Sequence, residues 1–172
     1  MKSRLALLIG MIFAAAAMRL LPHPSNFEPI GAIALFAGAY FDDKRWAFAA
    51  PLAAMLLSDA VIGFHSQMAG VYGAFALVVW LGSFLRERRT AVNVAGAGLA
   101  ASMLFFVVTN FGVWALDSLY PRTLEGLVVC YVAAIPFFAN TLAGTLFYAA
   151  VLFGGFALGE RKIAVFAPAA RS

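Results

Sequence analysis

Few residues in this sequence have side chains suited to chemistry, and two of them carry opposite charges within apolar segments. Asp59 lies in the apolar stretch 56–63, and Arg19 lies near the end of another apolar stretch. A carboxylate at membrane depth needs a cation or water beside it. We therefore expect an Arg19–Asp59 ion pair that fixes two helices. The alternative is a charged group that lines a cavity.

Amide, aromatic and imidazole side chains gather in three of the predicted loops and at the helix ends next to them. Pro22, Pro24 and Pro29 should make the first of these loops stiff, since proline fixes the backbone. A small-molecule pocket is built from such rigid, aromatic and hydrogen-bonding surroundings, although an interfacial aromatic belt has a similar composition. The predicted ligand-binding residues are Asn26, Phe27, His65, Tyr72, Asn110, Trp114 and Tyr120.

No set of catalytic residues is recognisable in the sequence. Both histidines, His23 and His65, fall in predicted loops, and neither a Gly-x-Ser-x-Gly motif nor a phosphate-binding glycine loop is present. Cys130 is the single cysteine, which excludes an internal disulfide. We therefore expect a protein that is not an enzyme, has no cofactor of its own and binds no nucleic acid.

The composition indicates that these residues are positioned by a membrane protein. Of 172 residues, 64% are hydrophobic and 12% are charged, with a mean hydropathy of +0.92. A soluble domain has about 45–50% apolar and about 25% charged residues. These values exclude a soluble globular domain, a disordered chain and a secreted disulfide scaffold.

Six apolar runs predict an all-α protein with six transmembrane helices in one compact domain, residues 1–172. The second run is short, so Asn26 and Phe27 are expected to extend it across the membrane, unless it is tilted little. The last run is longer than one span requires. We expect Pro136 to kink it, or an interfacial helix to precede the crossing. The runs cover residues 5–21, 29–41, 46–64, 69–85, 91–116 and 127–158.

The basic residues predict the orientation, because cytoplasmic segments are enriched in Lys and Arg. With both termini in the cytoplasm, ten of the 12 basic residues lie in inner segments, and only Arg19 and Arg122 lie outside. An alternative is a secretory signal cleaved after Ala14–Ala17, which would leave five helices.

Small residues recur every four positions in the first apolar run, at Ala6, Gly10 and Ala14. Such a ridge allows close approach of another helix in lipid. It either packs inside the bundle or docks a partner membrane protein.

Two segments carry a family resemblance, RLLPHPSNFEPIGAIALFAGA at 19–39 and LSDAVIGFH at 57–65. Over residues 19–155 the chain resembles an uncharacterised bacterial membrane family described as putative transport proteins. That family is similar to the S components, the substrate-binding subunits of energy-coupling-factor (ECF) vitamin transporters. The resemblance implies six helices in the bacterial inner membrane and a vitamin or metal bound at the outer side. It also implies that Ala6, Gly10 and Ala14 dock an energising transmembrane subunit, which works with ATPases.

Within that class the chain is most similar to small solitary members that bind cobalamin. In them a side chain after the third helix ligates the corrin cobalt, which implies His65 as the axial metal ligand here. Imidazole suits cobalt as a ligand.

The leading hypothesis is a membrane subunit that binds a small micronutrient for uptake, with lipid, the substrate and energising subunits as partners. A structural or assembly subunit of a larger membrane complex, without a ligand, is the alternative. A small enzyme acting on lipid has the least support.

Overall fold

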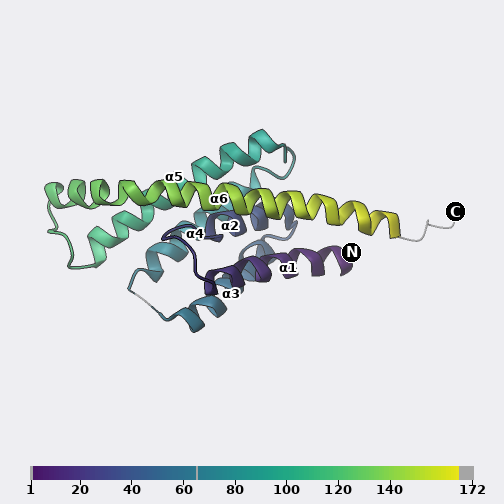
Figure 1. The fold of residues 1–172 in the computed structure, drawn as a ribbon, viewed down its shortest axis with the longest axis horizontal. Coiled ribbons are helices and arrows are strands. Elements are labelled where there is room, and N and C mark those ends of the chain that lie inside the picture. The colour runs from purple at the N-terminus through teal and green to yellow at the C-terminus, as the bar shows by residue number, and fades with distance from the viewer. Residues whose placement is uncertain (1, 65, 167–172) are drawn as a thin grey trace.

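The computed structural model describes residues 2–64 and 66–166, and these residues are helical with short connections (Figure 1). The predicted metal ligand His65 lies outside the described residues. In chain order the helices are α1 (Lys2–Ala17), the short 3-10 helix η1 (Met18–Leu20), α2 (Ile30–Tyr40), α3 (Lys44–Ile62), α4 (Met68–Ser83), α5 (Ala91–Leu116) and α6 (Leu124–Phe166).

Each of the six predicted apolar runs corresponds to one of the α-helices in the described chain, as expected for a helical membrane protein. Four segments, within α1–η1, α3, α5 and α6, are long and apolar enough to span a membrane. The other two helices, α2 and α4, are apolar but shorter. At 1.5 Å per residue, α2 is about 17 Å long, whereas the hydrocarbon core is about 30 Å thick.

The short α2 lies in the centre of the bundle, where all its residues except Gly31 are buried. Its closest neighbour is α4, because glycines stand where the two helices cross. A Cβ atom on Gly38 would lie 2.0 Å from the Val79 carbonyl oxygen, and one on Gly82 would lie 2.4 Å from the Leu35 carbonyl oxygen. Backbone-to-backbone contact of this kind requires residues without side chains.

The carbonyl groups that end α2 are satisfied by arginines from the α4–α5 loop. Arg86 donates to the Gly38 and Phe41 carbonyl oxygens at 3.1 and 2.8 Å, and Arg89 donates twice to the Ala39 carbonyl oxygen. The last turn of a helix leaves its carbonyls without partners. The arginines therefore allow this short helix to end inside the protein.

Asn26 and Phe27 do not extend the second helix. Helix α2 begins at Ile30, with Pro29 as its N-cap, and Asn26 has a positive φ of 63°. Proline disfavours the helical conformation in the residue before it. Because α2 is shielded from lipid by the other helices, non-helical backbone can complete the crossing.

The last run forms a single helix of 43 residues, α6, which continues through Pro136, so no separate interfacial helix precedes the crossing in the described chain. Proline removes one backbone hydrogen bond. Ending the helix in apolar surroundings would leave several more groups without partners, which favours continuation. Helix α6 runs along most of the molecule, beside α5 in its first part and beside α1 and α2 later (Figure 1).

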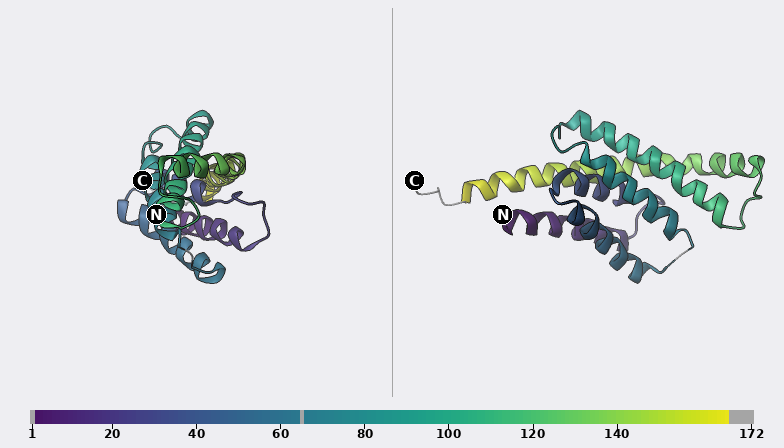
Figure 2. Two further views of the ribbon diagram at one scale, coloured as in Figure 1. Left: turned by 90° about the vertical axis from the view of Figure 1, so that its left-hand side faces the viewer. Right: turned by 180° about the vertical axis from the view of Figure 1, so that it is seen from behind.

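The start of α1 and the end of α6 lie toward the same end of the molecule, together with the basic α4–α5 loop (Figures 1 and 2). Arg4 forms an ion pair with Glu160 at 2.7 Å and stacks over Phe156. The Phe156 ring contacts the Tyr40 ring, on which Arg89 stacks at 4.3 Å. The start of α1, the end of α6 and the α4–α5 loop therefore meet at the same end.

Candidate functional site: a cavity beside a buried ion pair

At the opposite end of the bundle, Arg19 and Asp59 join η1 to α3. Arg19 Nη1 lies 2.7 Å from Asp59 Oδ1, and the two side chains are only 7% and 2% exposed. The Tyr72 hydroxyl, from α4, donates to Asp59 Oδ2 at 2.7 Å, and Arg19 also donates to the Ser58 hydroxyl. Both oxygens of the buried carboxylate thus have partners, as a buried charge requires.

A second carboxylate, Glu28, shares the same guanidinium. Its Oε2 atom lies 3.3 Å from Arg19 Nε, and its side chain is 31% exposed. Glu28 comes two residues before α2, whereas Asp59 lies on α3. The three side chains therefore carry two negative charges and one positive charge. Glu28 has the longer and more exposed of the two contacts.

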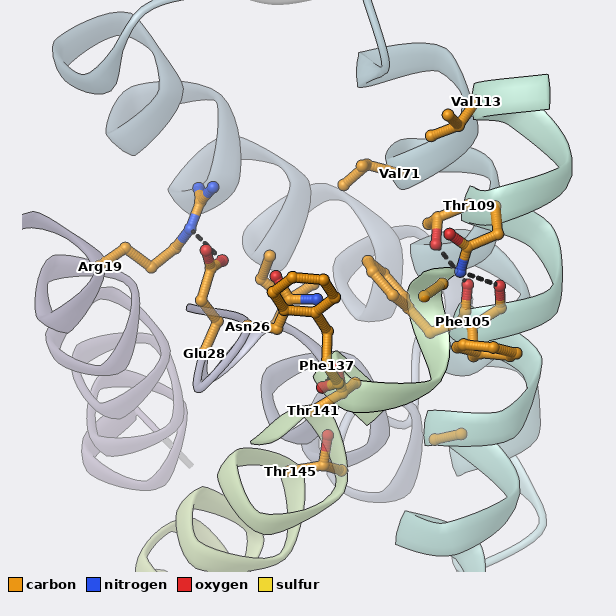
Figure 3. A pocket seen from close by; sticks show the side chains of 16 residues that line it. Arg19, Asn26, Glu28, Val71, Phe105, Thr109, Val113, Phe137, Thr141 and Thr145 are labelled. Atoms are coloured by element: carbon orange, nitrogen blue, oxygen red, sulfur yellow. Dashed lines mark hydrogen bonds and ion pairs between the residues drawn. The ribbon is translucent and has the colours of Figure 1, made fainter. Parts of the chain in front are cut away.

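Arg19 and Glu28 form one wall of a cavity of about 320 Å³ between α2, α4, α5 and α6 (Figure 3). Three phenylalanine rings, from α5 and α6, contribute much of its apolar surface, and amide and hydroxyl groups contribute the polar surface. The lining residues are Arg19, Asn26, Glu28, Ile30, Gly31, Val71, Ala101, Phe105, Phe106, Thr109, Asn110, Val113, Ala134, Phe137, Thr141 and Thr145.

Three polar residues of this lining donate hydrogen bonds within their own helices. The Thr109 hydroxyl donates to the Phe105 carbonyl, the Asn110 amide donates to the Phe106 carbonyl, and the Thr141 hydroxyl donates to the Phe137 carbonyl. A hydroxyl has one proton to donate, and an amide oxygen only accepts. These side chains therefore retain their acceptor oxygens and one N–H of Asn110 for a ligand.

The loop that carries Asn26 and Glu28 is held against α6. Asn140 Nδ2 donates to the Ser25 carbonyl oxygen at 3.0 Å, and the Phe27 ring packs against Phe147 and Tyr148. A Cβ atom on Gly144 would lie 2.9 Å from the Glu28 backbone nitrogen, so the loop rests directly on the helix backbone. These contacts fix the position of Glu28 at the cavity wall.

The structure brings two of the predicted ligand-binding residues, Asn26 and Asn110, to the cavity. Four others are not among its lining residues. Phe27 packs on α6, the Tyr72 hydroxyl bonds Asp59, the Trp114 indole donates to the Pro121 carbonyl, and Tyr120 lies in the α5–α6 loop. The seventh, His65, lies outside the described residues.

Sequence reasoning missed Glu28 and the inward-facing phenylalanines and threonines. A signal for them exists in the four-residue spacing of Ala101, Phe105, Thr109 and Val113, because residues four apart lie on one helix face. Phe137, Thr141 and Thr145 repeat the same spacing on α6.

The structure also bears on the single cysteine and on metal binding. The Cys130 thiol is buried and donates to the Asn110 carbonyl oxygen at 3.5 Å. Within the described residues, no group of three or more His, Cys, Asp or Glu side chains could hold a metal ion.

The ridge of Ala6, Gly10 and Ala14 faces outward from the described bundle, whereas Leu8 and Ile12 on the other side of α1 are buried. Among residues 2–64 and 66–166, and apart from the backbone of α1 itself, no atom would lie within 4 Å of a Cβ atom on Gly10. These small residues therefore do not serve packing inside the described chain.

Comparison with known proteins places the chain in a family without assigning an activity. No curated protein and no solved structure matches it. The model of a family of unknown function, DUF6580, matches residues 1–169. Because this match covers nearly the whole sequence, the chain belongs to the DUF6580 family.

Proposed function

We propose that this protein is a substrate-binding membrane subunit, which captures a small micronutrient such as a vitamin for uptake. The observation that carries the proposal is the cavity of about 320 Å³, lined by three phenylalanine rings and several polar side chains. Apolar and aromatic walls with a few placed polar groups are typical of small-molecule sites.

The size of the cavity favours a ligand built on one or two rings. Ligand pockets usually measure about 300–1,000 Å³, and this cavity is near the lower limit. It corresponds to roughly ten water molecules at about 30 Å³ each. We therefore favour a vitamin smaller than a corrin, and the proposal does not depend on cobalt ligation by His65.

Uptake against a gradient needs an energy source, and the sequence has no nucleotide-binding loop of its own. The exposed ridge of Ala6, Gly10 and Ala14 suits close contact with a helix of an energising transmembrane subunit. We propose that ATPases act on the protein through such a subunit. The predicted orientation puts the cavity at the outer side of the bacterial inner membrane.

The exposed ridge equally favours a second candidate, a structural subunit of a membrane complex that binds no small molecule. The two functions differ in what the cavity does. When a larger side chain fills the cavity, a binding subunit no longer binds its ligand. An assembly subunit with the same substitution still binds its partner subunits.

The test is ligand binding by the purified protein in lipid nanodiscs. Mass spectrometry identifies compounds that co-purify, and calorimetry measures binding of a panel of water-soluble vitamins. Ala101→Phe places a ring in the cavity, and Asn110→Leu removes an acceptor from its wall. Both should lower affinity by at least ten-fold.

Ala100→Phe is the matched control, because Ala100 is exposed on the same turn of α5 and does not line the cavity. It should bind like the unaltered protein. Absence of any co-purified compound together with no binding across the panel would refute the proposed function and leave the assembly subunit as the better candidate.

A further inference from the structure

We propose that the ligand of the cavity is a small organic cation and that Glu28 recognises its positive charge. This inference rests on the proposed function and specifies the substrate class of the same site. It is argued from the charge of the wall, from the hydrogen-bonding groups left free and from the aromatic lining.

The charge of the wall is the first argument. Arg19 is engaged with Asp59 at 2.7 Å, whereas its contact with Glu28 is longer, at 3.3 Å. One guanidinium cannot neutralise two carboxylates, so one negative charge remains at the cavity. Glu28 carries it to the ligand space, since it lines the cavity (Figure 3) and Asp59 does not.

A negative charge at a largely apolar cavity needs a counter-charge, because apolar surroundings solvate it poorly. No Lys and no Arg other than Arg19 lines this cavity. The ends of α2, α4 and α5 nearby contribute partial charges of both signs and not a full positive charge. A bound cation would supply it.

The hydrogen-bonding groups give the second argument. The Thr109 and Thr141 hydroxyls and one N–H of the Asn110 amide donate to backbone carbonyls of their own helices. Their oxygens, like the Glu28 carboxylate, accept hydrogen bonds. Such a wall suits a ligand that brings donors, such as an ammonium, an amine or an amide group.

The aromatic rings give the third argument. Phe105, Phe106 and Phe137 line the same cavity as Glu28. The faces of aromatic rings attract cations, and quaternary ammonium groups are commonly bound by several rings together. Carboxylate, acceptor oxygens and rings therefore all favour the same class of ligand.

The experiment compares pairs of similar probes that differ in charge, using the full chain in nanodiscs. One pair is choline and its neutral carbon isostere 3,3-dimethylbutan-1-ol. The other is 1-methylnicotinamide and neutral nicotinamide. By calorimetry, each cation should bind at least ten-fold more tightly than its neutral partner.

Glu28→Gln should remove this preference by weakening binding of the cations at least ten-fold, and Glu28→Asp should retain part of it. Glu125→Gln is the matched control, because Glu125 is exposed at the start of α6 and does not line the cavity. Its preference should be unchanged. Thermal unfolding of each variant shows whether it remains folded.

The inference is overturned if neutral probes bind as tightly as the cations, if neither cation binds, or if the preference survives in Glu28→Gln. A neutral or anionic vitamin bound in the cavity would also overturn it, while the proposed function would stand. Failure of every probe and every vitamin would refute both.

Discussion

Arg19 connects three segments of the chain through one guanidinium group. It contacts Asp59 and Ser58 on α3 and Glu28 before α2. A buried ion pair is weak support for stability as such, because desolvation opposes the attraction. Removing one partner is different, since the other charge is then left buried and unpaired.

We expect Arg19→Met to lower the free energy of unfolding by about 3–5 kcal/mol, because Asp59 loses its counter-charge in a nearly inaccessible position. Unfolding in mixed micelles with increasing SDS measures the change. Arg4→Met is the control, since it breaks an ion pair whose side chains are 36% and 39% exposed. Such a pair contributes at most about 1 kcal/mol. Equal losses in the two variants would contradict this account.

Some residues of the candidate site can be recognised from the sequence alone, and others cannot. Arg19 and Asp59 were recognisable because a charge is conspicuous in an apolar segment. Thr109 and Thr141 were not, because a threonine in a membrane helix satisfies its hydroxyl on its own backbone wherever it points. Only the rotation of each helix decides whether it reaches a cavity.

At the scale of elements, the crossing of α2 and α4 depends on two glycines. We expect Gly82→Ala to disrupt the fold, because the new methyl group would lie 2.4 Å from the Leu35 carbonyl oxygen on the neighbouring backbone. Folded yield and thermal unfolding measure the effect. Gly73→Ala in the same helix has open space around it and should be neutral or stabilise by up to about 1 kcal/mol. A stable, well-folded Gly82→Ala protein would show that the crossing is looser than described.

The outward ridge of α1 gives a second prediction at this scale. Gly10→Leu should leave the thermal stability and ligand affinity of the purified protein unchanged, because no other helix of the described residues comes within 4 Å of a Cβ atom at this position. Uptake of the ligand by cells should fall at least ten-fold, since the larger side chain prevents close approach of a partner helix. Leu5→Ile, on an exposed part of α1 beside the ridge, is the control. Unchanged uptake in Gly10→Leu would exclude docking on this ridge.

Helix number and order followed from hydropathy, whereas helix ends did not. The short α2 ends where Arg86 and Arg89 reach its carbonyls from the α4–α5 loop, a long-range contact that no local pattern encodes. Pro136 is a helix breaker by local preference, yet α6 continues through it. In both cases the surroundings of the helix outweigh the preference of the residue.

At the scale of the whole molecule, the start of α1, the end of α6 and the α4–α5 loop lie together, and this makes the predicted orientation in the membrane testable. In a Cys130→Ser background, Glu87→Cys marks the α4–α5 loop and Ser118→Cys marks the α5–α6 loop, and both positions are exposed. With cytoplasmic termini, a membrane-impermeant maleimide should label Ser118→Cys in intact cells. Glu87→Cys should react only after the inner membrane is permeabilised. The reverse labelling pattern would show that the protein has the opposite orientation, with the cavity on the cytoplasmic side.

The buried α2 also bears on how the protein is made. Its 11 residues are too few to be inserted by their own hydropathy. The groups that complete it, Gly82 at the crossing and Arg86 and Arg89 at its end, are synthesised some fifty residues later. The second helix to leave the ribosome is therefore among the last to reach its final environment, so a nascent chain released before Arg89 should be degraded.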